Sequence, residues 1–142
     1  MIKYSRQRES IKEFLMGRRD HPTAETVYLS LREKYPNISL GTVYRNLSLL
    51  ADMGEIMRIS TGDGPDRFDG NPNPHYHFFC RQCGQVSDLD MENIDIINVI
   101  ASHGFAGKVD GHVAHFYGIC PECVRKNFSE KNEKTVDNCK ML

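Results

Sequence analysis

Two pairs of cysteines constrain this chain more than any other feature of its sequence. Cys80 and Cys83 form one C-x-x-C pair, and Cys120 and Cys123 form a second pair after 36 intervening residues. Four thiolates suit a tetrahedral zinc ion, and a shell of four sulfur ligands is closed and therefore structural. We expect one structural Zn²⁺ per chain, with the intervening segment folded so that the pairs meet. A redox-active C-x-x-C motif or two unrelated thiol pairs are the alternatives.

The first residues and the cysteine usage also bear on where the protein works. MIKYSRQRES is polar and basic, unlike a signal peptide, and no apolar run approaches the roughly 18 residues that a membrane span needs. We therefore expect a cytoplasmic protein that does not contact the membrane. Disulfides are rare in that compartment, which favours metal or redox chemistry for the C-x-x-C pairs. Cys139 has no such partner and is expected to be a free thiol.

Charge is distributed unevenly along the 142 residues, although the net charge is only −1. Residues 1–50 carry nine Lys/Arg and five Asp/Glu (+4), whereas residues 51–142 carry nine and fourteen (−5). A basic first part beside an acidic second part suggests that only the first part faces a polyanion. An uneven but solvated surface is the alternative.

The first part of the chain predicts three helices followed by a β-hairpin. Apolar residues recur with helical spacing over residues 5–17, 23–35 and 40–53. Two strand-like pieces follow at 55–60 and 66–70, joined by the turn signal TGDGP. This order is that of a winged helix-turn-helix, in which the third helix is the recognition helix. A small helical domain with a polar surface is the alternative.

The third predicted helix has one apolar and one polar face. Ser39 is its expected N-cap, and Leu40, Val43, Leu47 and Leu50 form the stripe expected to be buried. The residues expected to contact DNA are Ser39, Thr42, Tyr44, Arg45 and Asn46.

The second part of the chain predicts a small mixed sheet. The segment NPNP at 71–74 is interpreted as a hinge, and HYHFFC, QVSDLD and KVDGHVAHFYGIC beyond it read as strands. The helix predicted over MENIDIINVIASHG has four residues expected to face inward, Ile94, Ile97, Ile100 and Ala101. The fold class is thus α+β, with a winged-helix domain at 1–70 and an α/β domain at 75–125. Residues 126–142 are polar and are expected to form a flexible tail.

His75 and His77 indicate a second candidate metal site. They alternate along a predicted strand, so both side chains face one side. Asp69 and Asp88 are near in sequence, and His21 would join them only if the two domains fold towards each other. Three imidazole nitrogens and two carboxylate oxygens suit Fe²⁺ or Mn²⁺, and also accept zinc, cobalt or nickel. A packed histidine pair, with His21 as an ordinary surface residue, is the alternative.

The sequence resembles the ferric uptake regulator family of bacterial metalloregulators. HPTAETVYLSLREKYPNISLGTVYRNL is similar to that family's helix-turn-helix, while DRFDGNPNPHYHFFCRQCG and YGICPEC are similar to its hinge and metal-binding segments. The resemblance covers about residues 5–125. It implies a homodimer formed through the second domain, which binds palindromic double-stranded operator DNA when a regulatory metal site is filled.

Within this family the sequence looks most like the peroxide-responsive repressors. The resemblance implies a structural zinc on the four cysteines of the C-x-x-C pairs. It implies a regulatory Fe²⁺ or Mn²⁺ on His21, Asp69, His75, His77 and Asp88. Peroxide would then oxidise a histidine ligand, His21 or His75, and release the operator. Asp69 follows the peroxide-responsive pattern, because iron-sensing members usually carry glutamate there.

Other functions remain open on the sequence. An iron-responsive repressor on the same fold is the main alternative, and Arg45 is a residue common in iron sensors. Many iron-sensing relatives have an extra metal site, which would correspond here to Tyr76, Asp95 and His112; Tyr76 replaces a usual acidic ligand. A small metallohydrolase would need an open coordination position, a general base and a substrate pocket. The helix-turn-helix gives no reason for one, so we expect no enzyme. A zinc module without a sensor function is the last alternative.

Overall fold

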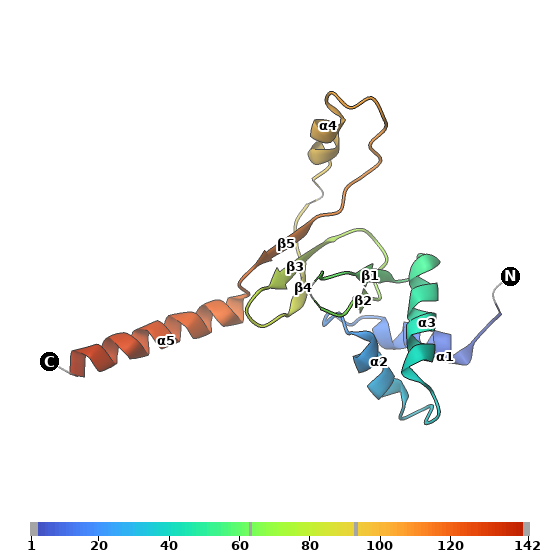
Figure 1. The fold of residues 1–142 in the computed structure, drawn as a ribbon, viewed down its shortest axis with the longest axis horizontal. Helices are drawn as coiled ribbons and strands as arrows, with labels where there is room; N and C mark the ends of the chain where they lie inside the picture. Colours follow the sequence, from blue (N-terminus) through green and yellow to red (C-terminus); the bar gives the residue numbers. More distant parts are fainter. Residues whose placement is uncertain (1–2, 63, 93, 141–142) are drawn as a thin grey trace. The chain divides into compact units, whose positions relative to one another are not determined.

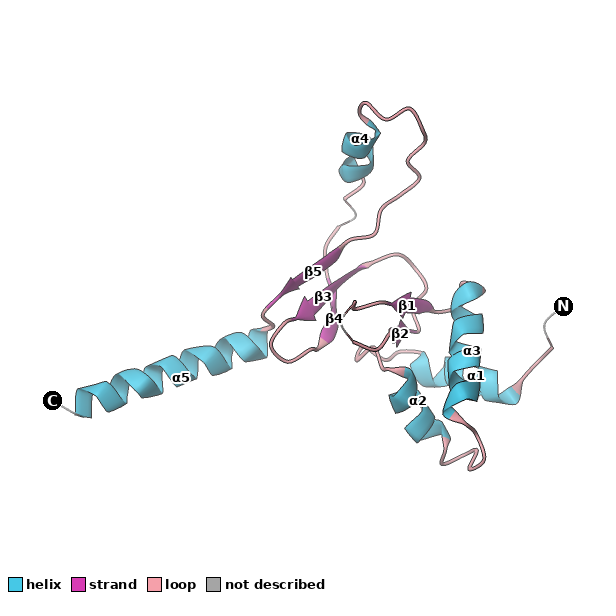
Figure 2. Ribbon diagram, in the orientation of Figure 1, coloured by secondary structure: helices cyan, strands magenta, loops and turns pink. Residues whose placement is uncertain are grey.

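The computed structural model describes the backbone of residues 3–62, 64–92 and 94–140, with side chains up to residue 131. The chain forms two compact units, Met1–Pro74 and His75–Leu142. Figure 1 labels the elements along the chain, and Figure 2 distinguishes helices from strands. The first unit contains α1 (Arg6–Leu15), α2 (Ala24–Leu31), α3 (Leu40–Asp52), β1 (Met57–Ile59) and β2 (Arg67–Asp69). The second contains β3 (Tyr76–Cys80), β4 (Val86–Leu89), α4 (Ile96–Ser102), β5 (His115–Gly118) and α5 (Pro121–Lys140).

Hydroxyl caps determine where the helices of the first unit begin. Ser5, Thr23 and Ser39 each accept a hydrogen bond from the backbone N–H three residues further along the chain. Helix α2 ends at Leu31, four residues before the predicted end, and residues 32–34 form a turn before Pro36. The three predicted helices are therefore present, with the second one shorter than expected.

One apolar core joins the three helices to the hairpin. Its buried members on α3 are Val43, Leu47 and Leu50, as the helical spacing predicts. Leu40 was expected among them but is 40% exposed, because it is the first residue of α3 and lies beyond the edge of that core. The remaining buried core residues are Ile11, Leu15, Ala24, Val27, Leu31, Ile38, Ile56 and Phe68.

The predicted hairpin is present and is antiparallel, with Met57 opposite Asp69 and Ile59 opposite Arg67. Three helices followed by a two-stranded hairpin confirm the predicted α+β fold with a winged helix-turn-helix in the first unit. Gly70, directly after β2, lies against the end of α1. A Cβ atom at this position would be 2.5 Å from the carbonyl oxygen of Leu15.

The second unit is built on a mixed three-stranded sheet in the order β4-β3-β5. Strand β3 pairs antiparallel with β4 and parallel with β5. A parallel pair needs a long crossover connection, and here the crossover is the segment from β4 to β5 that includes α4. The predicted mixed sheet is thus confirmed.

Helix α4 differs from the prediction in both length and packing. It covers only Ile96–Ser102, and none of its residues is buried in the described part of the chain. The prediction that its apolar residues face inward is wrong, since Ile97 is 38% and Ile100 66% exposed. Helical spacing identifies an apolar face, but it does not show whether a surface of the same chain covers that face.

The last part of the chain continues a helix. Residues 126–140, which the sequence analysis assigned to a flexible tail, extend α5 to Lys140 in Figure 1. The side chain of Cys139 lies outside the described residues. Among the helices that the structure describes, none is both long and apolar enough to cross a membrane.

We expect Gly70→Ala to lower the free energy of unfolding by about 1–3 kcal/mol, since the new methyl group meets backbone that cannot move aside cheaply. Urea denaturation followed by circular dichroism measures this change. Gly41→Ala is the matched control, because its Cβ would meet the side chains of Arg45 and Ser39 at the ordinary distances of 3.7 and 3.9 Å. Wild-type stability of Gly70→Ala would contradict the close approach to α1.

Candidate metal centres

The sheet of the second unit brings the two C-x-x-C pairs together. Cys80 ends β3, and the parallel register places it beside Gly118 at the end of β5. The chain turns after each strand, so Cys83 follows in the turn and Cys120 and Cys123 lie at the start of α5. The meeting of the two pairs therefore follows from the parallel pairing of β3 with β5.

The four cysteine side chains fit one zinc ion. Their Sγ atoms all lie within 4.8 Å of one another, and the Sγ atoms of Cys83 and Cys120 are 3.8 Å apart. A tetrahedral ion with Zn–S bonds of about 2.3 Å requires sulfur atoms about 3.8 Å apart. Cys80, Cys120 and Cys123 are buried, whereas Cys83 is exposed. The donor type, number and spacing thus agree with a structural site.

Backbone hydrogen bonds prepare one of the four cysteines to bind metal. The Sγ atom of Cys80 accepts from the backbone N–H of Cys83 at 3.5 Å and from that of Cys120 at 3.3 Å. These bonds favour the thiolate and lower the pKa of Cys80 to about 6. Burial instead raises the pKa of Cys123 to about 12. The zinc-free site therefore holds one ready thiolate and at least one thiol that ionises only with difficulty.

Contacts that do not involve sulfur also connect the two halves of this centre. The side-chain amides of Gln82 and Asn127 exchange two hydrogen bonds, of 3.1 and 3.0 Å. The backbone N–H of Arg81 donates to the carbonyl of Gly118 at 2.7 Å, and its guanidinium lies 3.9 Å from the centre of the Tyr117 ring. The sequence analysis missed these residues. Gln82 lies within the first C-x-x-C pair, and Asn127 lies one helical turn after the second pair. These positions beside the cysteines could have indicated both residues from the sequence.

The second unit also brings together three of the predicted regulatory ligands. The antiparallel register places His77 of β3 directly opposite Asp88 of β4, and His75 precedes β3 on the same side. The Nε2 atoms of His75 and His77 lie 3.1 and 3.4 Å from the same oxygen, Oδ1 of Asp88. Ligand atoms about 3 Å apart suit a metal ion bonded at about 2.1 Å. This His/Asp set therefore fits a divalent metal ion.

The first unit contains the other two predicted ligands, His21 and Asp69. Nε2 of His21 lies 3.1 Å from Oδ2 of Asp69, and their side chains are only 1% and 4% exposed. The other oxygen of Asp69 accepts a hydrogen bond from the backbone N–H of Asn71 at 2.9 Å, which orients the carboxylate. The pair therefore supplies one imidazole nitrogen and one carboxylate oxygen, which are the same two kinds of donor as in the His/Asp set.

Two side chains next to these donors were not among the predicted site residues. Arg67, two residues before Asp69, donates a hydrogen bond to the backbone carbonyl of His21 at 3.1 Å. His115 of β5 pairs with His77 across the parallel strands, and the ring centres are 6.5 Å apart. Strand alternation from Asp69 could have indicated Arg67, whereas the parallel pairing that brings in His115 left no signal in the sequence.

Tyr76 and His112, two of the three positions considered from the sequence for an extra metal site, belong to a hydrogen-bond network. The hydroxyl of Tyr76 lies 2.7 Å from Nε2 of His112 and accepts from the backbone N–H of Ile94 at 3.2 Å. Nδ1 of His112 is 2.8 Å from the side-chain oxygen of Asn98. A nitrogen facing an amide oxygen must donate, so Nε2 accepts the tyrosine proton in the neutral ring. Tyr76 and His112 thus connect β3 to α4.

The face of α3 expected to contact DNA carries its own hydrogen bonds. Tyr44 and Arg45 are exposed, while Thr42 and Asn46 are half-buried. Arg45 donates to the hydroxyl of Thr42 at 3.1 Å, and Ser39 accepts from the backbone N–H of Thr42 at 3.1 Å as the N-cap. Replacing Ser39 would therefore change the stability of α3 as well as any contact that its hydroxyl makes with a partner.

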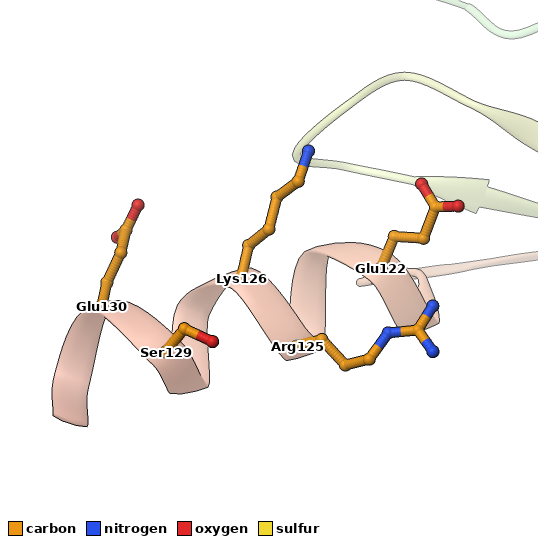
Figure 3. A pocket seen from close by; sticks show the side chains of 5 residues that line it. All are labelled: Glu122, Arg125, Lys126, Ser129 and Glu130. Carbon is orange, nitrogen blue, oxygen red and sulfur yellow. The ribbon is translucent and has the colours of Figure 1, made fainter. Parts of the chain in front are cut away.

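The pocket in Figure 3 is lined by none of the candidate metal ligands. It is lined by five polar side chains of α5, namely Glu122, Arg125, Lys126, Ser129 and Glu130. All five come from consecutive turns of one helix, and the four charged ones include both signs, which is the ordinary composition of a solvated helix surface. It offers no grounds for a substrate site.

Sequence comparisons match most of the chain. A sequence model of the ferric uptake regulator family matches residues 1–117. The peroxide-responsive repressor PerR of Staphylococcus epidermidis is 36% identical over 122 residues, covering 86% of this chain and 81% of the relative. The peroxide operon regulator of Bacillus subtilis is 36% identical over 125 residues, covering 88% and 86%.

Solved structures of similar fold include regulators of both iron and peroxide responses. The Helicobacter pylori ferric uptake regulator has a TM-score of 0.74 and 26% identity, covering 86% of this chain and 82% of that one. The Campylobacter jejuni peroxide stress regulator has a TM-score of 0.69 and 26% identity, covering 82% and 88%. The fold by itself therefore does not distinguish an iron sensor from a peroxide sensor.

We expect one cysteine of the zinc-free, reduced protein to ionise near pH 6. The pKa of Cys80 is lowered from its ordinary value of 9.0. Its thiolate therefore stabilises the folded state fully above pH 9, and this contribution is lost as the pH falls through about 6. Thiolate absorbance during a pH titration should show one early step, absent in Cys80→Ser and retained in Cys123→Ser. Ionisation of all the thiols only in their ordinary range, about 8–9, would contradict this account.

Proposed function

Because the chain belongs to the ferric uptake regulator family, we propose that it is a metal-dependent DNA-binding repressor that releases its operator when hydrogen peroxide oxidises a histidine ligand. The observation that carries the proposal is the convergence of histidine and aspartate donors at about 3 Å in each unit. The relatives named peroxide-responsive repressor and peroxide operon regulator support it, and both are regulators and not enzymes. Hydrolase chemistry therefore has no support.

In this proposal the two sets of donors bind one Fe²⁺ or Mn²⁺ ion. His21 and Asp69 supply two ligands, and His75, His77 and Asp88 supply three, so neither set fills a coordination shell alone. Three neutral nitrogens and two carboxylates suit either ion. Five protein ligands would leave room for peroxide to reach the bound ion. Ligands from Met1–Pro74 and His75–Leu142 would then fix the orientation of the two units.

The proposed zinc and the proposed regulatory metal have different duties. The four cysteines form a closed shell, so zinc would hold α5 to the end of β3 permanently. The regulatory ligands are nitrogen and oxygen donors of lower softness, which exchange metal more readily and leave an open position. We therefore assign sensing to the histidine and aspartate ligands, and stability to the cysteines.

The two units then have separate roles in operator binding. The first unit is the winged-helix DNA-binding domain, with α3 as recognition helix. The second unit is the dimerisation domain, and its partner is a second copy of this chain. The exposed apolar side chains of α4 support this assignment, because a face of this kind needs a cover. They are Ile96, Ile97, Val99 and Ile100.

Oxidation of a ligand would couple peroxide to the DNA. When bound, ferrous iron supplies the one-electron chemistry that activates peroxide. In the balanced reaction, a ring carbon of the histidine gains one oxygen atom from peroxide, and the other oxygen leaves as water.

The altered ring is a poorer ligand, so the two units lose their fixed orientation. In a symmetric dimer this changes the spacing of the two recognition helices, which must match the operator half-sites. Population shift requires only a few kcal/mol of differential metal affinity.

We expect peroxide to add the mass of one oxygen atom to a histidine-containing peptide of the iron-loaded protein. Trypsin releases His21 in the peptide 20–32, and it releases His75 and His77 together in the peptide 68–81, so fragmentation must locate the oxygen. The same treatment should lower operator affinity. The manganese-loaded protein is the control and should resist, because Mn²⁺ does not readily reduce peroxide. Equal oxidation of the two forms, or none in either, would remove the basis for the proposed signal.

Asp69→Glu separates the peroxide sensor from an iron sensor. The longer carboxylate changes how the ligand meets the metal, so we expect the peroxide concentration needed to release the operator to rise about tenfold. Metal-dependent operator binding should persist. Gel-shift titrations with iron and with manganese measure both properties. If operator binding by the variant and by the wild type depended on the iron concentration and did not differ between them in its response to peroxide, the iron-responsive alternative would be favoured.

A further inference from the structure

We propose that Arg67 is a positioning residue that holds His21 in a left-handed backbone conformation and so directs its imidazole at Asp69. This inference rests on the proposed function, in which His21 is a regulatory ligand. It concerns contacts within the first unit only. In this role Arg67 would make His21 available for oxidation.

The backbone of His21 is in an unfavourable conformation. Its φ angle is +48°, and it is the one residue other than glycine with a positive φ among those the structure describes. Side chains with a Cβ atom rarely adopt this region, although histidine does so more often than most. The next residue is Pro22, which lacks an N–H group and disfavours the ordinary helical conformation at the residue before it. Such a conformation persists only where neighbouring contacts hold it.

Three contacts of this kind come from consecutive residues of β2. The guanidinium of Arg67 donates to the carbonyl of His21 at 3.1 Å, and the backbone N–H of Phe68 donates to the carbonyl of Pro22 at 2.9 Å. Asp69 then faces the ring, with Oδ2 3.1 Å from Nε2 of His21. The loop before α2 is thus attached to the hairpin through its backbone and through its side chain.

Strand geometry explains how one strand makes both kinds of contact. Arg67 and Asp69 are two residues apart, so their side chains leave β2 on the same face. One meets the backbone oxygen of His21 and the other meets its ring. Phe68 points to the opposite face, where it is buried in the core of the first unit. The buried phenylalanine therefore fixes the strand from which the other two residues reach His21.

Loss of the arginine should act on the metal site without unfolding the unit. The core would remain, but the His21 carbonyl would lose its charged donor and the bond from Phe68 to Pro22 would open more often. The backbone could then relax towards a favourable φ, which would move the imidazole away from Asp69. Regulatory metal affinity should fall, and oxidation should shift from His21 towards His75.

Arg67→Met tests the proposal in the full-length chain, and Arg67→Lys is the conservative variant, because its ammonium can still donate to a carbonyl. Arg58→Met is the matched control. Arg58 belongs to the same hairpin and is exposed, and its Nε atom forms an ion pair with Oδ2 of Asp66 at 3.9 Å. The Arg58→Met substitution therefore removes one positive charge from the hairpin, as Arg67→Met does, and leaves the contact between Arg67 and His21 in place. Thermal unfolding of each metal-free variant reports whether the fold is intact, and Arg67→Lys carries the test if Arg67→Met unfolds.

The first readout needs no metal. Amide hydrogen exchange at Phe68 reports the bond to Pro22, and it should be faster in Arg67→Met than in the wild type or Arg58→Met. Exchange that matches the wild type would overturn the proposed hold on the loop. If the wild type bound no regulatory metal, the proposed function would fail, and this readout would still decide the role of Arg67.

The second readout uses Mn²⁺ as the probe. Affinity measured by isothermal titration should fall about tenfold in Arg67→Met and less in Arg67→Lys, with Arg58→Met at the wild-type value. Iron and peroxide should then place a smaller share of oxygen on His21 than in the wild type. The tryptic peptide carrying His75 lengthens to 59–81 in Arg67→Met. Faster exchange with unchanged Mn²⁺ affinity and unchanged oxygen distribution would overturn the positioning role. Equal losses in Arg58→Met would also overturn it, since they would trace the effect to wing charge.

Discussion

The pairing of β3 with its two neighbours is the constraint on which both candidate metal centres depend. Its parallel register with β5 places Cys80 beside the end of that strand, so that the chain delivers the second C-x-x-C pair to the first. Its antiparallel register with β4 sets His77 opposite Asp88. One five-residue strand thus carries a sulfur centre at one end and a nitrogen and oxygen centre at the other. A shift of one residue in the parallel register would separate the two C-x-x-C pairs, and a shift in the antiparallel register would separate His77 from Asp88.

The two donors of the first unit come from segments that are far apart in the chain. His21 lies in the loop before α2, and Asp69 ends the hairpin. Strand β2 joins them through consecutive contacts to the backbone and the ring of His21. Gly70 then allows the chain to pass close to the end of α1. Ligand geometry in this unit is therefore inseparable from the packing of the hairpin on the helices.

Much of this arrangement could be predicted from the sequence, because it follows from local chemistry. Hydroxyl caps at Thr23 and Ser39 and the spacing of apolar residues identify the helices. The two C-x-x-C pairs predict a site with four sulfur donors, and the structure brings these four cysteines together. The left-handed conformation of His21 and the arginine that holds it could not be predicted, since both arise from tertiary contact between distant segments. The exposed face of α4 was missed for the same reason, because periodicity cannot reveal what covers a helix.

The central claim is that one regulatory metal ion bonds side chains from both units of the chain. Pulsed electron paramagnetic resonance of the Mn²⁺-loaded protein tests it most directly, because it detects the histidine nitrogens bonded to the metal. We predict one Mn²⁺ per chain, with a nitrogen coupling lost in His21→Ala and another lost in His77→Ala. A His21→Ala spectrum identical to that of the wild type would contradict the claim.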